Sequence, residues 1–320
     1  MPLILSVLLF CISTFVLVRG ADTFVENADK IGKAMRLPSF LTGVLVVAIG
    51  TSLPELATGV ASLLNEKATS DMMVGTVLGS NVANVFLGLG AVIVLSRKNL
   101  KFKQNIFQVH FPILMTSTIA VIFMSLDHQI TAQEGGILWG IMVSYLWFLF
   151  KTEATPFGEK IHHEVFRWKY VLFLIIGLLA LVGGANFVVE SILDLGTYLI
   201  IQLGVSSEIL TALSATLTAI GTSLPEMVVV YVSMRKGNAE MAVGNILGSN
   251  IFNILLILGV GSLISPLAVD GINYTVVLPF SVASFFVYWT VSKDQEITQQ
   301  ESLAMVFLYI LFLGKLYGWM

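Results

Sequence analysis

The sequence predicts an all-α polytopic membrane protein with ten transmembrane helices, arranged as two inverted five-helix repeats. The first observation is composition: of 320 residues, 56% are apolar and only 12% are charged, and the mean hydropathy is +0.89. An ordinary soluble domain carries about twice that charged fraction. The second is that apolar residues lie in runs of about 20, long enough for a helix to cross a ~30 Å hydrocarbon layer. The third is a set of motifs that occurs twice.

Windows of about 19 residues give the ten expected spans. Their limits are 2–19, 39–64, 72–96, 106–126, 132–151, 169–190, 207–234, 239–265, 273–292 and 300–319. The single cysteine, Cys11, lies in the first span, so the chain can form no intrachain disulfide and no cysteine-based metal site. The repeat described below includes this first span, which favours its retention over cleavage as a signal peptide.

The distribution of Lys and Arg predicts the orientation of these spans. With the N-terminus outside, every basic residue except Lys67 and Lys315 falls in an odd-numbered, cytoplasmic loop. Cytoplasmic loops of membrane proteins carry such an excess of basic residues. We therefore expect a multi-pass protein of the cell membrane, surrounded by the lipid bilayer, with both termini outside. No basic stripe suited to nucleic acid is present, and the sequence leaves the oligomeric state open.

Two motifs recur in the second half of the chain. Residues 50–55, GTSLPE, return letter for letter at 221–226, and residues 74–84, VGTVLGSNVAN, are echoed by 243–253, VGNILGSNIFN. Each copy belongs to a set of five spans, and because five is odd the second copy enters the membrane upside down. Inverted repeats of this kind suit alternating access, with the site between the two halves.

The repeat divides the chain into two halves and a linker. The first half is 1–151, the polar stretch 152–168 forms a cytoplasmic linker, and the second, inverted half is 169–320.

The GTSLPE motif places a glutamate halfway along two otherwise apolar spans, at Glu55 and Glu226. An ionisable residue near the bilayer centre costs roughly 2.5–3.5 kcal/mol on insertion scales. Neither span contains a Lys or Arg that could pair with its glutamate. A bound cation is therefore the expected counter-charge.

The other residues of the motif add neutral oxygen ligands. Proline removes a helix hydrogen bond and so frees a carbonyl oxygen, and we expect local unwinding at Gly50 and Gly221. The motif hydroxyls are those of Thr51, Ser52, Thr222 and Ser223. Two such segments together supply the six or more oxygens that Ca²⁺ prefers.

The GSN segments complete the predicted site. Ser80 and Asn84 are four residues apart and share one helix face, and Ser249 and Asn253 repeat that spacing. Their neutral oxygens suit Na⁺, and the whole set indicates hard cations and not soft metals. The alternative, a close-packing helix face with hydrogen bonds between helices, remains open for these four residues. The asparagines that directly follow Ser80 and Ser249 point about 100° away and are assigned to structure.

At these residues the sequence resembles the cation/Ca²⁺ exchanger superfamily, specifically the prokaryotic Na⁺/Ca²⁺ exchangers. The doubled motifs look like the two alpha-repeats of that family, and the resemblance covers the whole chain. It implies that Glu55 and Glu226 bind Ca²⁺ and also serve Na⁺ sites. It further implies carbonyl ligands at Ala48, Thr51, Ala219 and Thr222, Na⁺-site hydroxyls at Ser52, Ser80, Ser223 and Ser249, and a central position completed by Asn84 and Asn253.

The expected function is thus secondary antiport of Na⁺ against Ca²⁺, with both ions as substrates, no cofactor and no enzymatic activity. The alternatives within the same fold are a Ca²⁺/H⁺ exchanger and a K⁺-dependent Na⁺/Ca²⁺ exchanger. Asparagine at both 84 and 253 disfavours K⁺ dependence, because K⁺-dependent relatives use acids in this region. The H⁺-coupled branch usually departs from Thr-Ser-Leu-Pro after the glycine. An intramembrane enzyme and a passive channel are further alternatives.

Overall fold

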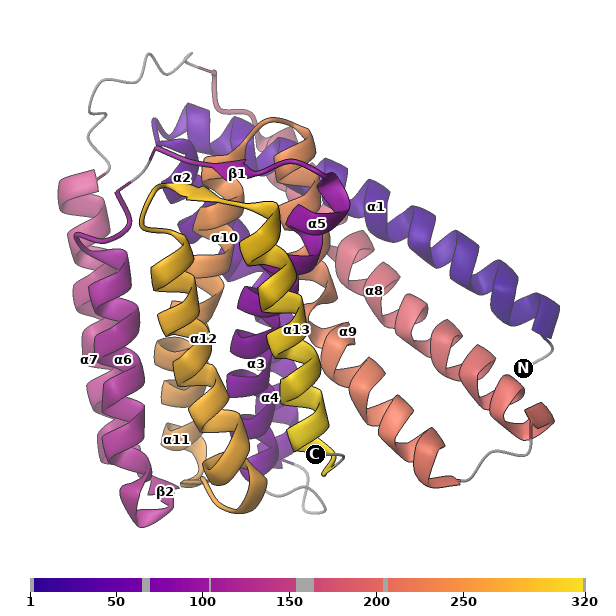
Figure 1. Ribbon diagram of the computed structural model, residues 1–320. Helices are drawn as coiled ribbons and strands as arrows, with labels where there is room; N and C mark the ends of the chain where they lie inside the picture. Colours follow the sequence, from indigo (N-terminus) through magenta and orange to yellow (C-terminus); the bar gives the residue numbers. More distant parts are fainter. Residues whose placement is uncertain (1–2, 65–69, 104, 154–163, 204–206, 319–320) are drawn as a thin grey trace.

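The chain is almost entirely helical in the computed structural model, which describes residues 3–64, 70–103, 105–153, 164–203 and 207–318 (Figure 1). Between residues 199 and 220 it describes only the course of the helices, without their side chains. Residues 154–163, the greater part of the expected linker, lie outside the described part.

The α-helices are packed side by side, and several of them continue through a π-helical segment. In chain order they are α1 (Leu3–Ala34), α2 (Ser39–Thr42), α3 (Ile49–Leu64), α4 (Asp71–Ala83), α5 (Val92–Ser96), α6 (His110–Met124), α7 (Ala132–Phe148), α8 (Trp168–Leu203), α9 (Ser207–Arg235), α10 (Ala239–Phe252), α11 (Gly259–Ile264), α12 (Leu278–Val291) and α13 (Gln299–Leu316). The π-helical segments are η1 (Gly43–Ala48), η2 (Asn84–Ala91), η4 (Leu149–Glu153), η5 (Asn253–Leu258) and η6 (Asn273–Val277), and η3 (Ser125–Asp127) is a 3-10 turn.

Seven helical rods in the described part are long and apolar enough to cross a membrane. They are Ile4–Ala34, Ser39–Leu64, Asp71–Ser96, His110–Asp127, Trp168–Tyr198, Ala239–Ile264 and Asn273–Val291. The other three expected spans coincide with α7, α9 and α13, which are also helical, and α9 is described up to residue 220 only by its helical course. The α7 helix has 17 residues before η4 begins, and α13 opens with two glutamines and a glutamate.

Helices α1 and α8 are longer than the sequence predicts. The expected ends at residues 19 and 190 are wrong, since α1 has 32 residues and α8 has 36. At about 1.5 Å per residue each exceeds a ~30 Å hydrocarbon layer, so a spanning helix of this length tilts. Figure 1 shows both helices at a slant beside the other helices. Ion pairs at i,i+4, Lys30 with Glu26 and Lys33 with Asp29, both at 2.5 Å, support α1 beyond its apolar part.

Glycines allow α1 and α8 to pack backbone against backbone. A Cβ atom added at Gly20 would lie 2.5 Å from the Leu181 backbone nitrogen, and one at Gly184 would lie 2.7 Å from Leu17 Cα. Small residues permit this close approach between membrane helices, where van der Waals contact replaces the hydrophobic driving force.

Two short antiparallel strand pairs join distant loops at opposite ends of the molecule. Strand β1 (Leu100–Lys101) pairs with β4 (Glu296–Ile297), and β2 (Gln129–Ile130) pairs with β3 (Leu267–Ala268). Figure 1 shows β1 at the upper end and β2 at the lower end. Hydrogen bonds from Asn99 and then Lys101 hold the pKa of Glu296 below its usual value.

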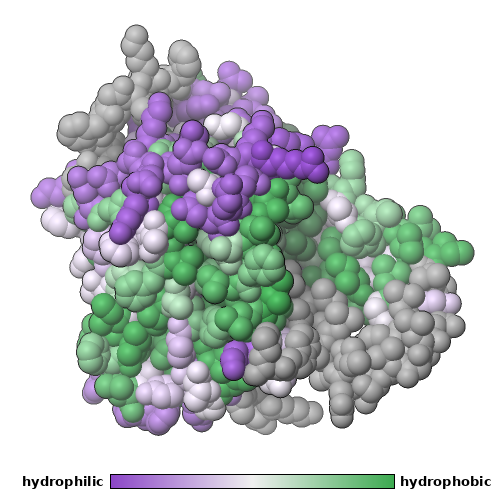
Figure 2. Space-filling view, viewed as in Figure 1, coloured by the Kyte–Doolittle hydropathy of each residue, from purple (hydrophilic) through white to green (hydrophobic). Residues whose placement is uncertain are grey.

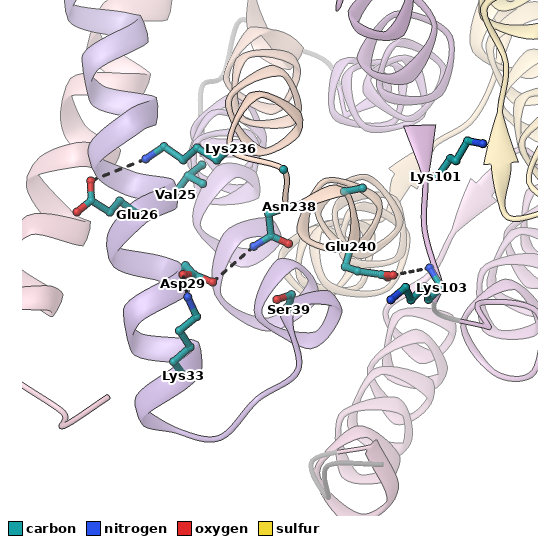
Figure 3. Close-up of a pocket in the computed structure, with 12 residues that line it drawn as sticks. Val25, Glu26, Asp29, Lys33, Ser39, Lys101, Lys103, Lys236, Asn238 and Glu240 are labelled. Atoms are coloured by element: carbon teal, nitrogen blue, oxygen red, sulfur yellow. Dashed lines mark hydrogen bonds and ion pairs between the residues drawn. The ribbon is translucent and has the colours of Figure 1, made fainter. Parts of the chain in front are cut away.

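Lysines from three loops gather at the β1 end, around a pocket of about 480 Å³ (Figure 3). They are Lys33 at the end of α1, Lys101 and Lys103 at β1, and Lys236 between α9 and α10. The backbone nitrogen of Lys103 donates to Glu240 on α10. Figure 2 shows hydrophilic residues over this end and hydrophobic residues over the helices below it.

A different set of loops meets at the opposite end. The backbone nitrogen of Ala268, in β3, donates to the Ser70 hydroxyl at 3.1 Å. The backbone nitrogen of Val269 donates to the carbonyl of His128 at 2.9 Å. Ser70, directly before α4, therefore lies with the β2 and β3 loops, apart from the residues that line the pocket.

Adjacent glycines on α8 give a test of the α1–α8 contact. In Gly184→Ala the new methyl group meets the Leu17 backbone, and we expect a loss of about 1–3 kcal/mol in the free energy of unfolding. A Cβ at Gly183 meets nothing within 4 Å, so Gly183→Ala should be neutral or stabilising by under about 1 kcal/mol. Chemical unfolding of both variants in detergent measures the difference, and equal stabilities would contradict this packing.

Candidate cation-binding site

The two motif glutamates lie in the interior, on α3 and α9. Glu55 is 2% exposed and Glu226 is 1% exposed. They lie on helices from opposite halves of the chain. Both oxygens of Glu55 and Oε2 of Glu226 accept no hydrogen bond, and no Lys or Arg in the described part pairs with either glutamate. Two buried carboxyl groups thus lie in the interior without a basic partner among the described residues.

The backbone around these glutamates differs in one respect from expectation. The prediction of local unwinding at Gly50 and Gly221 is wrong, because α3 and α9 stay helical through both glycines and through the prolines that follow. On the α3 side the departure from α-helical geometry lies earlier, in η1, which ends at Ala48. Pro54 still lacks the N–H that would bond the Gly50 carbonyl, and a wider π-turn is a common feature of functional sites in helices.

Hydroxyl groups from the two halves of the chain meet beside the glutamates. The Thr51 hydroxyl lies 3.4 Å from the Ser249 hydroxyl and donates to Asn245 Oδ1 at 3.3 Å. The Ser80 hydroxyl lies 3.2 Å from that of Ser223. Each contact joins a GTSLPE motif to the GSN segment of the opposite half.

Asparagines at the C-terminal ends of α4 and α10 form reciprocal hydrogen bonds between the two halves of the chain. Asn253 Nδ2 donates to Asn81 Oδ1 at 2.9 Å, and Asn84 Nδ2 donates to Asn250 Oδ1 at 3.4 Å. The oxygens Asn84 Oδ1 and Asn253 Oδ1 are buried and have no partner. These two residues are also where η2 and η5 begin.

Glycines bring α10 against α2 and η1, which sets the distance between the two halves. A Cβ at Gly244 would lie 2.3 Å from the Phe40 carbonyl oxygen, and one at Gly248 would lie 2.7 Å from Ala48 Cβ. The equivalent glycine of the first GSN segment, Gly79, has nothing within 4 Å of its Cβ position. The glycine of the GSN segment is thus required for close helix packing in the second half of the chain, at Gly248, and not in the first, at Gly79.

Of the predicted ligands, Thr51 contacts Ser249 and Ser80 contacts Ser223. Buried oxygens without a hydrogen-bond partner come from both motif types: Ser52 Oγ, Glu55 Oε1, Glu55 Oε2, Asn84 Oδ1, Glu226 Oε2 and Asn253 Oδ1. Buried polar atoms in proteins are nearly always hydrogen-bonded, so such a group needs an explanation. Ala48 is buried at the end of η1, Thr222 is half-buried beside Ser223, and Ala219 lies in the stretch of α9 described only as helix.

Sequence reasoning missed three asparagines. Asn245 received no role, and Asn81 and Asn250 were assigned to structure, yet all three contact predicted ligands. The only signal was the repetition of Asn after Ser80 and Ser249. No group of three or more His, Cys, Asp or Glu side chains suited to a metal occurs among the described residues. The candidate site is thus two carboxylates among neutral oxygens.

A bundle of apolar helices around two unpaired carboxylates and neutral oxygens is the architecture of a membrane cation antiporter. The family model described as sodium/calcium exchanger protein matches residues 5–151 and 169–318. The chain belongs to this family, which confirms the resemblance seen in its motifs.

Individual relatives match along nearly the whole chain. Sodium/calcium exchanger MaX1 of Methanosarcina acetivorans is 29% identical over 345 aligned residues, covering 94% of this chain and 95% of the relative. Inner membrane protein YrbG of Escherichia coli is 29% identical over 304 residues, covering 90% of each. A structure of the sodium-calcium exchanger NCX_Mj, soaked with 10 mM Na⁺ and zero Ca²⁺, superposes with a TM-score of 0.78 at 26% identity, covering 97% of this chain and 98% of that chain.

The glycine difference between the two GSN segments gives a second test. Gly248→Ala forces α10 away from η1, so we expect a loss of about 1–3 kcal/mol in stability and a weaker Ca²⁺-induced rise in melting temperature. Gly79→Ala should leave both quantities near their wild-type values. Thermal unfolding in detergent, with and without Ca²⁺, compares the variants. A Gly79→Ala protein as impaired as Gly248→Ala would refute the assigned packing.

Proposed function

We propose that this protein is a secondary antiporter that exchanges Na⁺ for Ca²⁺ across the cell membrane by alternating access. The observation that carries the proposal is the group of unpartnered buried oxygens around Glu55 and Glu226. Two ionised carboxylates have a charge of −2, which one Ca²⁺ balances, and Ca²⁺ takes six to eight oxygen ligands. The similarity to MaX1 and NCX_Mj, both named as sodium/calcium exchangers, supports the same substrates.

Competition between the ions explains the coupling. Glu55 and Glu226 would bind Ca²⁺ and also contribute to Na⁺ sites, so the two ions exclude each other. The neutral ligands divide as the family resemblance implies: hydroxyls of Ser52, Ser80, Ser223 and Ser249 at the Na⁺ sites, carbonyls of Ala48, Thr51, Ala219 and Thr222 beside the glutamates, and Asn84 and Asn253 at the centre. An empty site would keep two uncompensated charges in a medium of low dielectric. Reorientation is therefore favoured only when cations are bound.

Several features support ten spans in two inverted halves, 1–151 and 169–320, joined by a linker at 152–168. The capping box of α7, Thr131 with Glu134, is matched by that of α13, Thr298 with Glu301. Segments η2 and η5 begin at equivalent asparagines. The β1–β4 and β2–β3 pairs lie at opposite ends, as a pseudo-two-fold axis in the membrane plane requires.

The arrangement of the loops supports the proposed orientation. Lysines expected on the cytoplasmic side line one pocket, and Ser70, directly before α4, contacts β3 at the other end. Lys151 lies 4.7 Å from the Trp147 ring centroid and Lys293 lies 4.3 Å from that of Trp289. Tryptophans mark membrane interfaces and lysines the cytoplasmic one. Both termini are then outside.

Removing one carboxylate charge tests the mechanism directly. Glu55→Gln keeps the shape of the side chain and removes the charge that balances Ca²⁺, so Na⁺-gradient-dependent ⁴⁵Ca²⁺ uptake into proteoliposomes should fall to background. The matched control is Glu190→Gln, which changes an exposed glutamate of α8 and should keep wild-type uptake. Unimpaired exchange by folded Glu55→Gln would rule the mechanism out.

The same vesicles identify the coupling ion. Na⁺, K⁺ and H⁺ gradients are imposed separately on wild-type protein. Only a Na⁺ gradient directed out of the vesicles, with Na⁺ concentrated inside, should drive Ca²⁺ uptake. Uptake driven by a pH gradient without Na⁺ would instead establish the Ca²⁺/H⁺ alternative. Dependence on K⁺ as well as Na⁺ would establish the K⁺-dependent one.

Single cysteines test the topology. In a Cys11→Ser background, Lys315→Cys should react with a membrane-impermeant maleimide in intact cells, because the C-terminus is expected outside. Lys98→Cys, exposed beside β1, should react only after the cytoplasmic face is opened. Labelling of both positions from the same side would contradict the proposed span count.

A further inference from the structure

Two buried asparagines contact predicted cation ligands without being ligands themselves. Asn81 follows Ser80 on α4, Asn250 follows Ser249 on α10, and both are 0% exposed. Each accepts a hydrogen bond from an asparagine of the other half. The acceptor for Asn253 Nδ2 is Asn81 Oδ1, and the acceptor for Asn84 Nδ2 is Asn250 Oδ1.

These hydrogen bonds determine whether the side-chain amides of Asn84 and Asn253 direct their oxygen or their nitrogen toward the interior. A primary amide has an acceptor oxygen on one side and a two-proton donor on the other. With Nδ2 of Asn84 and Asn253 bonded across the halves, Oδ1 of each is left buried and unpartnered. A flipped amide would instead direct N–H groups toward a cation, which repels it. An uncharged amide therefore needs an external acceptor to be a reliable cation ligand.

We propose that Asn81 and Asn250 are positioning residues that fix the amide orientation of Asn253 and Asn84, so that both amide oxygens face the transported cation. The inference rests on the proposed function. Each half of the chain thereby orients the ligand of the other half. Groups that orient metal ligands in this way typically alter metal affinity by 10- to 100-fold when removed.

The two bonds differ in strength. The Asn253–Asn81 bond measures 2.9 Å, near the optimum for N–H···O, whereas the Asn84–Asn250 bond measures 3.4 Å. Asn81 is itself held by a bond of 3.4 Å from its Nδ2 to the Asn250 carbonyl, and Asn250 Nδ2 has no partner. Loss of Asn81 should therefore weaken cation binding more than loss of Asn250.

The first experiment separates orientation from mere packing. Asn81→Leu removes the acceptor at similar volume, and should raise the apparent KM for Ca²⁺ by about tenfold while the maximal exchange rate is kept. Asn81→Asp retains an acceptor oxygen for Asn253 Nδ2, and should return KM toward the wild-type value. A purely structural role predicts the opposite order, because Asp introduces a buried charge and Leu does not.

The second experiment is a double-mutant cycle with Asn253→Asp. A carboxyl group offers an oxygen on either side and has no amide to orient, so adding Asn81→Leu should change KM by less than about twofold in that background. Asn250→Leu, with Asn84→Asp as its partner, repeats the cycle if Asn81→Leu does not fold. Additive effects in the cycles, or an unchanged KM in folded Asn81→Leu, overturn the positioning role.

Ca²⁺-induced thermal stabilisation in detergent keeps the two proposals distinguishable. Wild-type protein that shows neither Ca²⁺ stabilisation nor Na⁺-driven uptake overturns the proposed function and this inference with it. Wild-type protein that shows both, together with an Asn81→Leu variant of unchanged Ca²⁺ dependence, overturns the inference alone.

Discussion

The structure is organised around two buried glutamates with which no Lys or Arg in the described part of the chain pairs. Glu55 on α3 and Glu226 on α9 are both buried. Such an arrangement is unfavourable for folding unless a counter-ion is available. Under the proposed function, the neutral oxygens nearby, the close glycine contacts of α10 with η1 and the cross-half hydroxyl pairs would together form a space that a cation completes.

Much of this arrangement was predictable from the sequence, because it is local and repeated. The doubled GTSLPE and GSN motifs identify the glutamates and their serine and asparagine neighbours by spacing alone. Helix lengths were less predictable. The apolar signal of α1 fades after Arg19, but i,i+4 ion pairs extend the helix to Ala34, and a hydropathy window does not register them.

Features that depend on two distant segments could not be predicted. The partner of Asn253 is Asn81, 172 residues earlier, and its identity depends on how α4 and α10 are placed relative to each other. The same holds for Thr51 and Asn245. The unwinding expected at Gly50 was wrong because a proline removes a single N–H, and α3 and α9 both stay helical through their prolines.

The two strand pairs limit how the molecule can move. Strands β1 and β2 come from the first 151 residues, and β3 and β4 come from the part after residue 168, so each end of the molecule is clasped across its two halves. A rocker-type motion that parts the halves at one face would have to break the clasp there. A reorientation that keeps both strand pairs intact can move only helices that carry none of these strands. Helices α1 and α8, which slant beside the other helices and pack on each other through glycines, carry neither strand pair and are therefore free to move in this way.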